Sequence, residues 1–238
     1  SIGSPSARAS CSTRASIVFV TNFGTDYSGR IIDVPATTGY GEPIQKLFKL
    51  KDGEKIIAAM SLDPRVIGDV SEREGKRPLT YGVAATSDGY SLSFGLAPFL
   101  EPSTRAGRRY AKPADGAEVV GAGKASGKEL AICATKQGRA LISPADDINY
   151  LSGPGKGVVL VKLDDKDDAL VGFIVTKDKN QALTLESSGG GERSVSPGDY
   201  KPTGRGGKGH EILKRGTFVR AIPQSPSVPP PFDQAKDQ

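Results

Sequence analysis

Short apolar segments separated by turn residues recur along the whole 238-residue chain. Four of them align without gaps, and each holds a strand-like run, a hydroxyl residue, two turn residues and a glycine: residues 18–24, 83–89, 132–138 and 185–191. The hydroxyl residues are Thr21, Thr86, Thr135 and Ser188. A second strand-like run follows each glycine, in residues 26–32, 90–94, 140–143 and 192–195. Because glycine readily adopts the positive φ of tight turns, this pattern predicts four β-hairpins.

A glycine-rich loop follows each predicted hairpin, in residues 38–43, 104–109, 152–157 and 203–209. An apolar run comes after each loop, in residues 44–48, 116–120, 158–161 and 212–214. The hairpin glycines are 65, 49 and 53 residues apart. Repeats of roughly 50 residues made of short strands are typical of propeller blades or similar radial modules.

The composition agrees with an all-β fold. The chain has 30 glycines and 17 prolines, which disfavour helices, and it has no tryptophan. Its apolar runs, such as residues 157–161, are far shorter than the roughly 18 residues of a membrane-spanning helix. These features exclude a helical bundle, a coiled coil and a membrane protein, and we expect an almost helix-free domain.

Two segments outside the repeats differ in composition. Residues 1–15 contain Ser, Ala and Arg without an acid, and we interpret them as a disordered or remnant segment, with a transit peptide as the alternative. Residues 223–238 form a proline-rich tail that we expect to be disordered. Between them, residues 16–222 are expected to form one domain of four repeats, at about 16–66, 67–126, 127–170 and 171–222.

The charge is unevenly distributed. The net charge is +5, with basic clusters in residues 101–112 and 199–220 and an acidic run in residues 163–170. This balance favours an anionic partner. The acidic run lacks the spacing of a calcium loop, so we interpret it as a solvated loop between blades that would locally disfavour such a partner. Of the two cysteines, Cys133 lies in an apolar strand and is expected to be buried, and a cytosolic setting is the default.

The glycine-rich loops are the candidate binding sites. Glycine lets backbone N–H groups approach phosphates, and Lys or Arg neutralises their charge. We predict that the residues that contact phosphates, and DNA if the family resemblance given below holds, lie in and beside these loops: Arg105, Arg108, Arg109, Lys112, Arg139, Lys156, Arg205, Lys208, Lys214 and Arg215. The alternative is that they are solvated surface charges. The second and fourth loops should contribute most, and the first little, because it carries Glu42 and no base.

Enzyme motifs are poorly supported. Residues 204–209 match the dinucleotide-binding pattern G-x-G-x-x-G, but Pro202 stands where a strand is needed and no helix pattern follows. Lys156 and Lys208 are followed by glycine rather than by the Ser or Thr of a phosphate-binding P-loop. His210, the only histidine, is more simply a phosphate neighbour or an exposed residue than a catalytic base. We therefore predict no catalytic residue, cofactor or metal site on this chain.

The loop and hairpin motifs together resemble the C-terminal domain of bacterial type IIA topoisomerase A subunits. Residues 21–24, 32–35, 41–43 and 52–56 follow the order of one blade of that family. Residues 203–209 are similar to the Q-R-R-G-G-K-G box of gyrase, with Thr203 and Gly204 at its first two places. The box lies in the last repeat and the other loops are degenerate, so the resemblance is to topoisomerase IV rather than to gyrase.

This resemblance implies a β-pinwheel, a propeller-like ring of four-stranded blades that exchange a strand with a neighbour. Family members commonly have five or six blades, and the four found here leave ring closure open. The implied role is a non-catalytic domain that wraps duplex DNA, in an ATP-dependent enzyme whose catalytic Tyr lies in a separate N-terminal breakage-reunion region. The implied partners are duplex DNA, that region and an ATPase B subunit, in a nucleoid-associated cytoplasmic setting. A protein–protein interaction module of propeller type is the alternative.

Overall fold

The computed structural model describes residues 15–31 and 46–223. Several sequence predictions concern residues outside these ranges. They are the first glycine-rich loop at residues 38–43 with Glu42, most of the segment 1–15, Ile32 at the end of the first predicted hairpin, and nearly all of the tail at 223–238.

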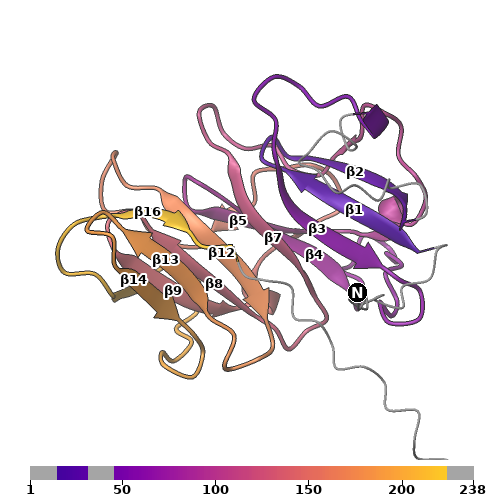
Figure 1. The fold of residues 1–238 in the computed structure, drawn as a ribbon. Coiled ribbons are helices and arrows are strands. Elements are labelled where there is room, and N and C mark those ends of the chain that lie inside the picture. The colour runs from indigo at the N-terminus through magenta and orange to yellow at the C-terminus, as the bar shows by residue number, and fades with distance from the viewer. Residues whose placement is uncertain (1–14, 32–45, 224–238) are drawn as a thin grey trace, which may run out of the picture.

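Four small sheets follow one another along the chain, each built on one of the predicted hairpins (Figure 1). Blade 1 contains β1 (Ser16–Thr21), β2 (Thr25–Arg30) and β3 (Ile56–Leu62). Blade 2 contains β4 (Tyr81–Thr86), β5 (Tyr90–Phe94) and β7 (Val119–Ala125). Blade 3 contains β8 (Leu130–Thr135), β9 (Arg139–Pro144) and β12 (Leu170–Thr176). Blade 4 contains β13 (Leu183–Ser187), β14 (Glu192–Val195) and β16 (Phe218–Ala221).

The all-β prediction is confirmed. Helical elements in the described residues are short turns such as the 3-10 helices η2 (Ala97–Phe99) and η3 (Ala145–Asp147). None of the helices found between residues 15 and 223, outside the gap at 32–45, is long and apolar enough to cross a membrane.

Three blades receive a further strand from the next repeat. β6 (Arg108–Arg109) pairs with β2, β11 (Val158–Val159) pairs with β5, and β15 (His210–Glu211) pairs with β9, all antiparallel. Blade 2 also gains β10 (Tyr150–Leu151), which runs parallel to β5. The four-strand expectation therefore holds for blades 1 and 3, whereas blade 2 has five strands and blade 4 has three among the described residues.

The hairpin turns confirm three of the four predicted glycines. Gly24, Gly89 and Gly138 have positive φ, and each donates its N–H to the carbonyl of the preceding threonine. The fourth assignment, to Ser188 and Gly191, was wrong by one residue, because Gly190 has the positive φ and donates to Ser187. The turn between β13 and β14 is one residue longer than the others, and three consecutive glycines concealed this shift.

The core lies between neighbouring blades. Val18 and Val20 of β1 share one cluster with Ala84 and Leu92 of blade 2. The same packing recurs between blades 2 and 3 and between blades 3 and 4. Because inner blades are covered on both faces, β4 is buried along its whole length. Cys133 is fully buried, as predicted, and burial raises the pKa of its thiol to about 12.

The face of blade 4 that points away from blade 3 is polar. Leu183 and Leu185 of β13 face blade 3, so the residues that alternate with them face outward. There the hydroxyls of Thr184 and Ser194 share a hydrogen bond of 3.0 Å. On the same side, Arg220 Nε donates to Glu186 Oε2 at 2.6 Å. This outer face therefore carries two hydrogen-bonded pairs of polar side chains, while Val219 of β16 is 55% exposed.

The two ends of the strands differ in the connections that they carry. The hairpin turns 22–24, 87–89, 136–138 and 188–191 lie at one end, which we call the hairpin face. Since β3 is antiparallel to β1, with Leu62 opposite Ser16, the connection to the next blade leaves from the other end. The connections 63–80, 126–129 and 177–182 define this linker face.

Candidate nucleic-acid interface

Each exchanged strand begins at a glycine that nothing larger can replace. Gly107, Gly157 and Gly209 have φ of 71°, 87° and 76°. A Cβ on them would lie 2.7, 2.0 and 2.2 Å from the backbone oxygens of Asp26, Ser91 and Ala140, respectively. A backbone oxygen cannot rotate away as a side chain can. The glycines of the basic loops therefore permit the strand exchange as well as any approach of a ligand.

Two residues after each exchanged strand fix the chain to the preceding hairpin. Their N–H groups both donate to the carbonyl of that hairpin's glycine: Tyr110 and Ala111 to Gly24, Leu160 and Val161 to Gly89, Ile212 and Leu213 to Gly138. This corrects the assignment of residues 116–120 as the apolar run of the second repeat, because they lead into β7 instead. The equivalent pair is Tyr110–Ala111.

A lysine stands directly after this apolar pair in every repeat. The four side chains, which we call the lysine row, are all exposed: Lys49, Lys112, Lys162 and Lys214. The backbone N–H of the first three donates to the glycine-rich loop of the following repeat, at Arg105 O (2.8 Å), Gly155 O (2.9 Å) and Gly207 O (2.8 Å). Consecutive loops are thus joined by main-chain hydrogen bonds along the hairpin face.

Lys112 and Lys214 were among the predicted residues, whereas Lys49 and Lys162 were missed. The signal that could have found them is the repeated pattern of two apolar residues followed by lysine. In the second repeat the apolar run had been placed at 116–120, which hid the common position.

The predicted residues of the second loop are exposed. Arg105, Arg108, Arg109 and Lys112 all lie on the surface around β6. Arg105 Nη2 donates to Lys46 O at 3.2 Å, and Arg109 Nε donates to Ala111 O at 3.2 Å. These are single bonds to carbonyls, and no carboxylate among the described residues forms an ion pair with the cations of this loop.

The third and fourth loops hold cations that have partners within the chain. Lys156 Nζ lies 3.8 Å from Asp88 Oδ2 and 3.9 Å from the centre of the Tyr90 ring. Lys208 Nζ and Arg139 Nε contact the two oxygens of Asp164, at 2.8 and 2.9 Å. These two bonds lower the pKa of the Asp164 carboxyl below its usual value.

The remaining predicted residues of the fourth repeat differ among themselves. Arg205 donates to two backbone carbonyls, Asp147 O at 2.8 Å and Val159 O at 3.3 Å. Lys214 and Arg215 are exposed, and neither has an ion pair with any described residue. The Arg205 side chain is therefore held by hydrogen bonds, whereas Lys214 and Arg215 have no acidic partner among the described residues.

Two sequence interpretations of single residues need correction. The acidic run is not simply a solvated loop, because Asp168 is buried and accepts the N–H groups of Gln137 and Ala169. His210 is partly buried in β15 rather than exposed, with its ring 5.4 Å from that of Tyr200. Asp168 therefore stabilises the hairpin turn of blade 3, and the His210 ring packs against Tyr200.

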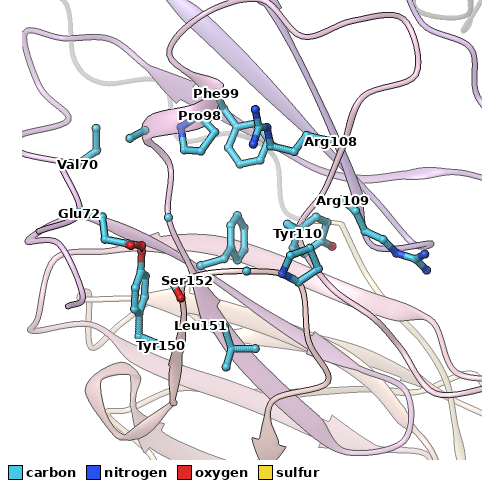
Figure 2. A pocket seen from close by; sticks show the side chains of 15 residues that line it. Val70, Glu72, Pro98, Phe99, Arg108, Arg109, Tyr110, Tyr150, Leu151 and Ser152 are labelled. Carbon is cyan, nitrogen blue, oxygen red and sulfur yellow. The ribbon is translucent and has the colours of Figure 1, made fainter. Parts of the chain in front are cut away.

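A pocket of about 290 Å³ lies between blades 1 and 2, beside β6 and the third loop. Figure 2 shows Glu72 and Tyr150 on one side of it and Arg108, Arg109 and Tyr110 on the other. The Tyr150 hydroxyl donates to Glu72, and Tyr110 is almost fully buried, with its hydroxyl donating to Thr21 O. The hydroxyls of Tyr150 and Tyr110 are thus both hydrogen-bonded within the chain.

The exchanged strands and radial packing of the blades define the class of fold, a β-pinwheel of the propeller type. The family model described as "DNA gyrase C-terminal domain, beta-propeller" matches residues 33–63 and 129–177. The A subunit of DNA gyrase from Helicobacter pylori strain J99 is 26% identical over 197 residues, 81% of this chain and 22% of the relative. The A subunit of DNA gyrase from Chlamydia trachomatis is 26% identical over 204 residues, 84% of this chain and 23% of the relative.

Solved C-terminal domains share the fold. That of a DNA topoisomerase IV has a TM-score of 0.72 and 16% identity, over 88% of this chain and 64% of that one. That of E. coli ParC has a TM-score of 0.63 and 21% identity, over 90% and 83%. A DNA gyrase A C-terminal domain has a TM-score of 0.63 and 20% identity, over 94% and 73%.

These matches agree with the resemblance indicated by the loop motifs: the chain is similar to the C-terminal domains of type IIA topoisomerase A subunits. It spans about a fifth of the length of the gyrase A relatives that it matches. The sequence relatives are gyrase subunits, whereas the structural neighbours include both gyrase A and topoisomerase IV. The assignment to topoisomerase IV rather than gyrase stays a prediction.

Proposed function

We propose that this chain is a DNA-wrapping domain that binds the backbone of duplex DNA without sequence specificity. The observation that carries the proposal is the run of joined glycine-rich loops, which brings exposed cations from all four repeats to the hairpin face. Because the blades are arranged radially, a duplex following these loops must bend. Bending a few tens of base pairs costs on the order of 1–6 kcal/mol, which additional phosphate contacts can offset.

The chemistry of this face favours phosphate over base contacts. Lys and Arg side chains and backbone N–H groups neutralise and position phosphates, whereas bases are read by contacts in the grooves. The large aromatic side chains near the second loop, Phe94, Phe99 and Tyr110, are buried and therefore poorly placed for stacking on bases. A salt-dependent, nearly sequence-independent interaction is the expected result.

In the full protein, we propose, the repeats at residues 16–222 act as a non-catalytic accessory domain of an ATP-dependent type II topoisomerase. The chain covers only 22% of the Helicobacter pylori gyrase A subunit, and the proposal assigns to the full protein a role inferred from that similarity. It implies a catalytic Tyr in a breakage-reunion region of the same polypeptide, a partner ATPase B subunit, and a nucleoid-associated cytoplasmic location. Here the domain would hold one DNA segment and influence which crossing is passed.

The test is a titration of a labelled duplex of about 40 base pairs over a range of salt concentrations, with two unrelated sequences. The logarithm of the binding constant should fall linearly with the logarithm of salt concentration, by about 0.9 for each phosphate contact, and equally for both sequences. No binding at about 50 mM salt, or a flat salt response, would refute DNA wrapping and favour a protein-interaction module.

A further inference from the structure

We propose that the lysine row, and not the lysines within the glycine-rich loops, forms the main phosphate-binding positions of this domain. The row consists of Lys49, Lys112, Lys162 and Lys214, one from each repeat. The inference rests on the proposed DNA binding and assigns it to particular side chains. Its ligand is the phosphodiester backbone of a duplex that runs along the hairpin face.

The first argument is the fixed position of the backbone. In repeats 2 and 3 the two residues before the row lysine donate to a hairpin glycine, and the lysine itself donates to the next loop. Lys112 is held in this way between Gly24 and Gly155, and Lys162 between Gly89 and Gly207. The main chain is therefore ordered before any ligand arrives. Only the side chain loses freedom on binding, which keeps the entropic cost low.

The second argument is that the lysines within the third and fourth loops already have acidic partners. A phosphate that binds Lys156 or Lys208 must displace Asp88 or Asp164, respectively. Arg139 shares Asp164, so it meets the same competition. The row lysines have no ion pair among the described residues, so no carboxylate there competes with a phosphate for them.

The third argument is regular placement. The row occupies the same position in four consecutive repeats, whereas the other predicted cations differ from loop to loop. At the position of Lys156 and Lys208, for example, the second repeat has Ala106. Equivalent positions in radially arranged blades lie on a smooth curve, which is the geometry that a bent duplex backbone requires.

The experiment compares two variants with the same loss of charge. One replaces the four row lysines with glutamine. The matched control replaces four exposed lysines of the linker face with glutamine: Lys76, Lys128, Lys177 and Lys179. Both are titrated with the labelled duplex across salt concentrations, and circular dichroism checks that both fold.

The row variant should lose about 3–4 units of the salt slope. If the parent and the variant bind equally at 1 M salt, each lost lysine contact makes the variant bind about eightfold more weakly than the parent at 0.1 M salt. The control should keep the parental slope to within about one unit. Equal slopes for the row variant and the control would overturn the inference while leaving DNA binding intact. If the parent chain itself does not bind, the proposed function fails instead. Should the fourfold row variant not fold, four single substitutions, each expected to remove about 0.9 units, replace it.

Discussion

Replacing Gly209 with alanine tests whether strand exchange holds the blades together. Gly209 precedes β15, and an added Cβ would lie 2.2 Å from Ala140 O and 2.7 Å from its carbonyl carbon. The chain offers a control in the same loop: Gly206 has φ of 88°, close to the 76° of Gly209, but an added Cβ there meets nothing within 4 Å. The two variants share the chemical change and the backbone strain and differ only in the clash.

The magnitude follows from these contacts. Alanine in the left-handed region costs roughly 1–2 kcal/mol, which both variants should show. In Gly209→Ala, β15 must also move from β9, which weakens the bonds from Ile212 and Leu213 to Gly138 O. At about 1–1.5 kcal/mol for each of these two bonds, the extra loss is about 2–3 kcal/mol.

Thermal unfolding followed by circular dichroism gives the comparison. For a domain of this size, each kcal/mol lowers Tm by roughly 2–4 °C. Gly209→Ala should therefore melt about 4–12 °C below Gly206→Ala. Because Lys214 follows the displaced strand, the salt slope of DNA binding by Gly209→Ala should also decrease. Equal melting temperatures for the two variants would refute the tight contact between the glycine and the neighbouring strand.

Two further predictions concern single carboxylates. Asp26 is fully buried without a hydrogen-bond partner among the described residues, and burial raises its pKa well above the usual value. The folded state therefore binds the proton more tightly, and its stability falls as pH rises from about 4 toward the raised pKa. Asp26→Ala should stabilise the fold at pH 7 by roughly 1–3 kcal/mol, measured as a higher Tm. This gain in stability should become smaller toward pH 4. A gain that does not depend on pH would contradict the prediction. Asp164→Asn should release Arg139 and Lys208 for phosphate, increasing DNA affinity at low salt and the salt slope by up to about 2. Unchanged or weaker binding in the same titration would show that Asp164 does not compete with DNA.

Local sequence patterns predicted the hairpins well because a glycine with positive φ determines each turn. Gly24, Gly89 and Gly138 all lie where the pattern placed them. The fourth turn was misplaced by one residue because Gly189, Gly190 and Gly191 are interchangeable in a gapless alignment. Only the backbone hydrogen bonds identify which of them takes the left-handed conformation.

The candidate site was less predictable because its geometry depends on contacts between repeats. Nothing local in the sequence shows that Lys208 and Arg139, 69 positions apart, share the carboxylate of Asp164. Strand exchange is likewise a long-range pairing, and it was expected only from the family resemblance. Strand exchange also determines where the lysine row lies in each repeat, and this explains why Lys49 and Lys162 were not predicted.

The polar outer face of blade 4 disfavours the packing of a further blade against it. Another blade, from this chain or from a second molecule, would have to bury the paired side chains of Thr184, Glu186 and Arg220. Its edge strand β14, which no other described strand extends, begins with Glu192 and Arg193, and such charges disfavour edge-to-edge β-pairing with a second molecule. In repeat proteins such a surface acts as a terminal cap, which keeps a quasi-one-dimensional stack finite and soluble. Lengthening the domain by protein engineering would therefore begin with apolar substitutions on this face, at the risk of open-ended filaments.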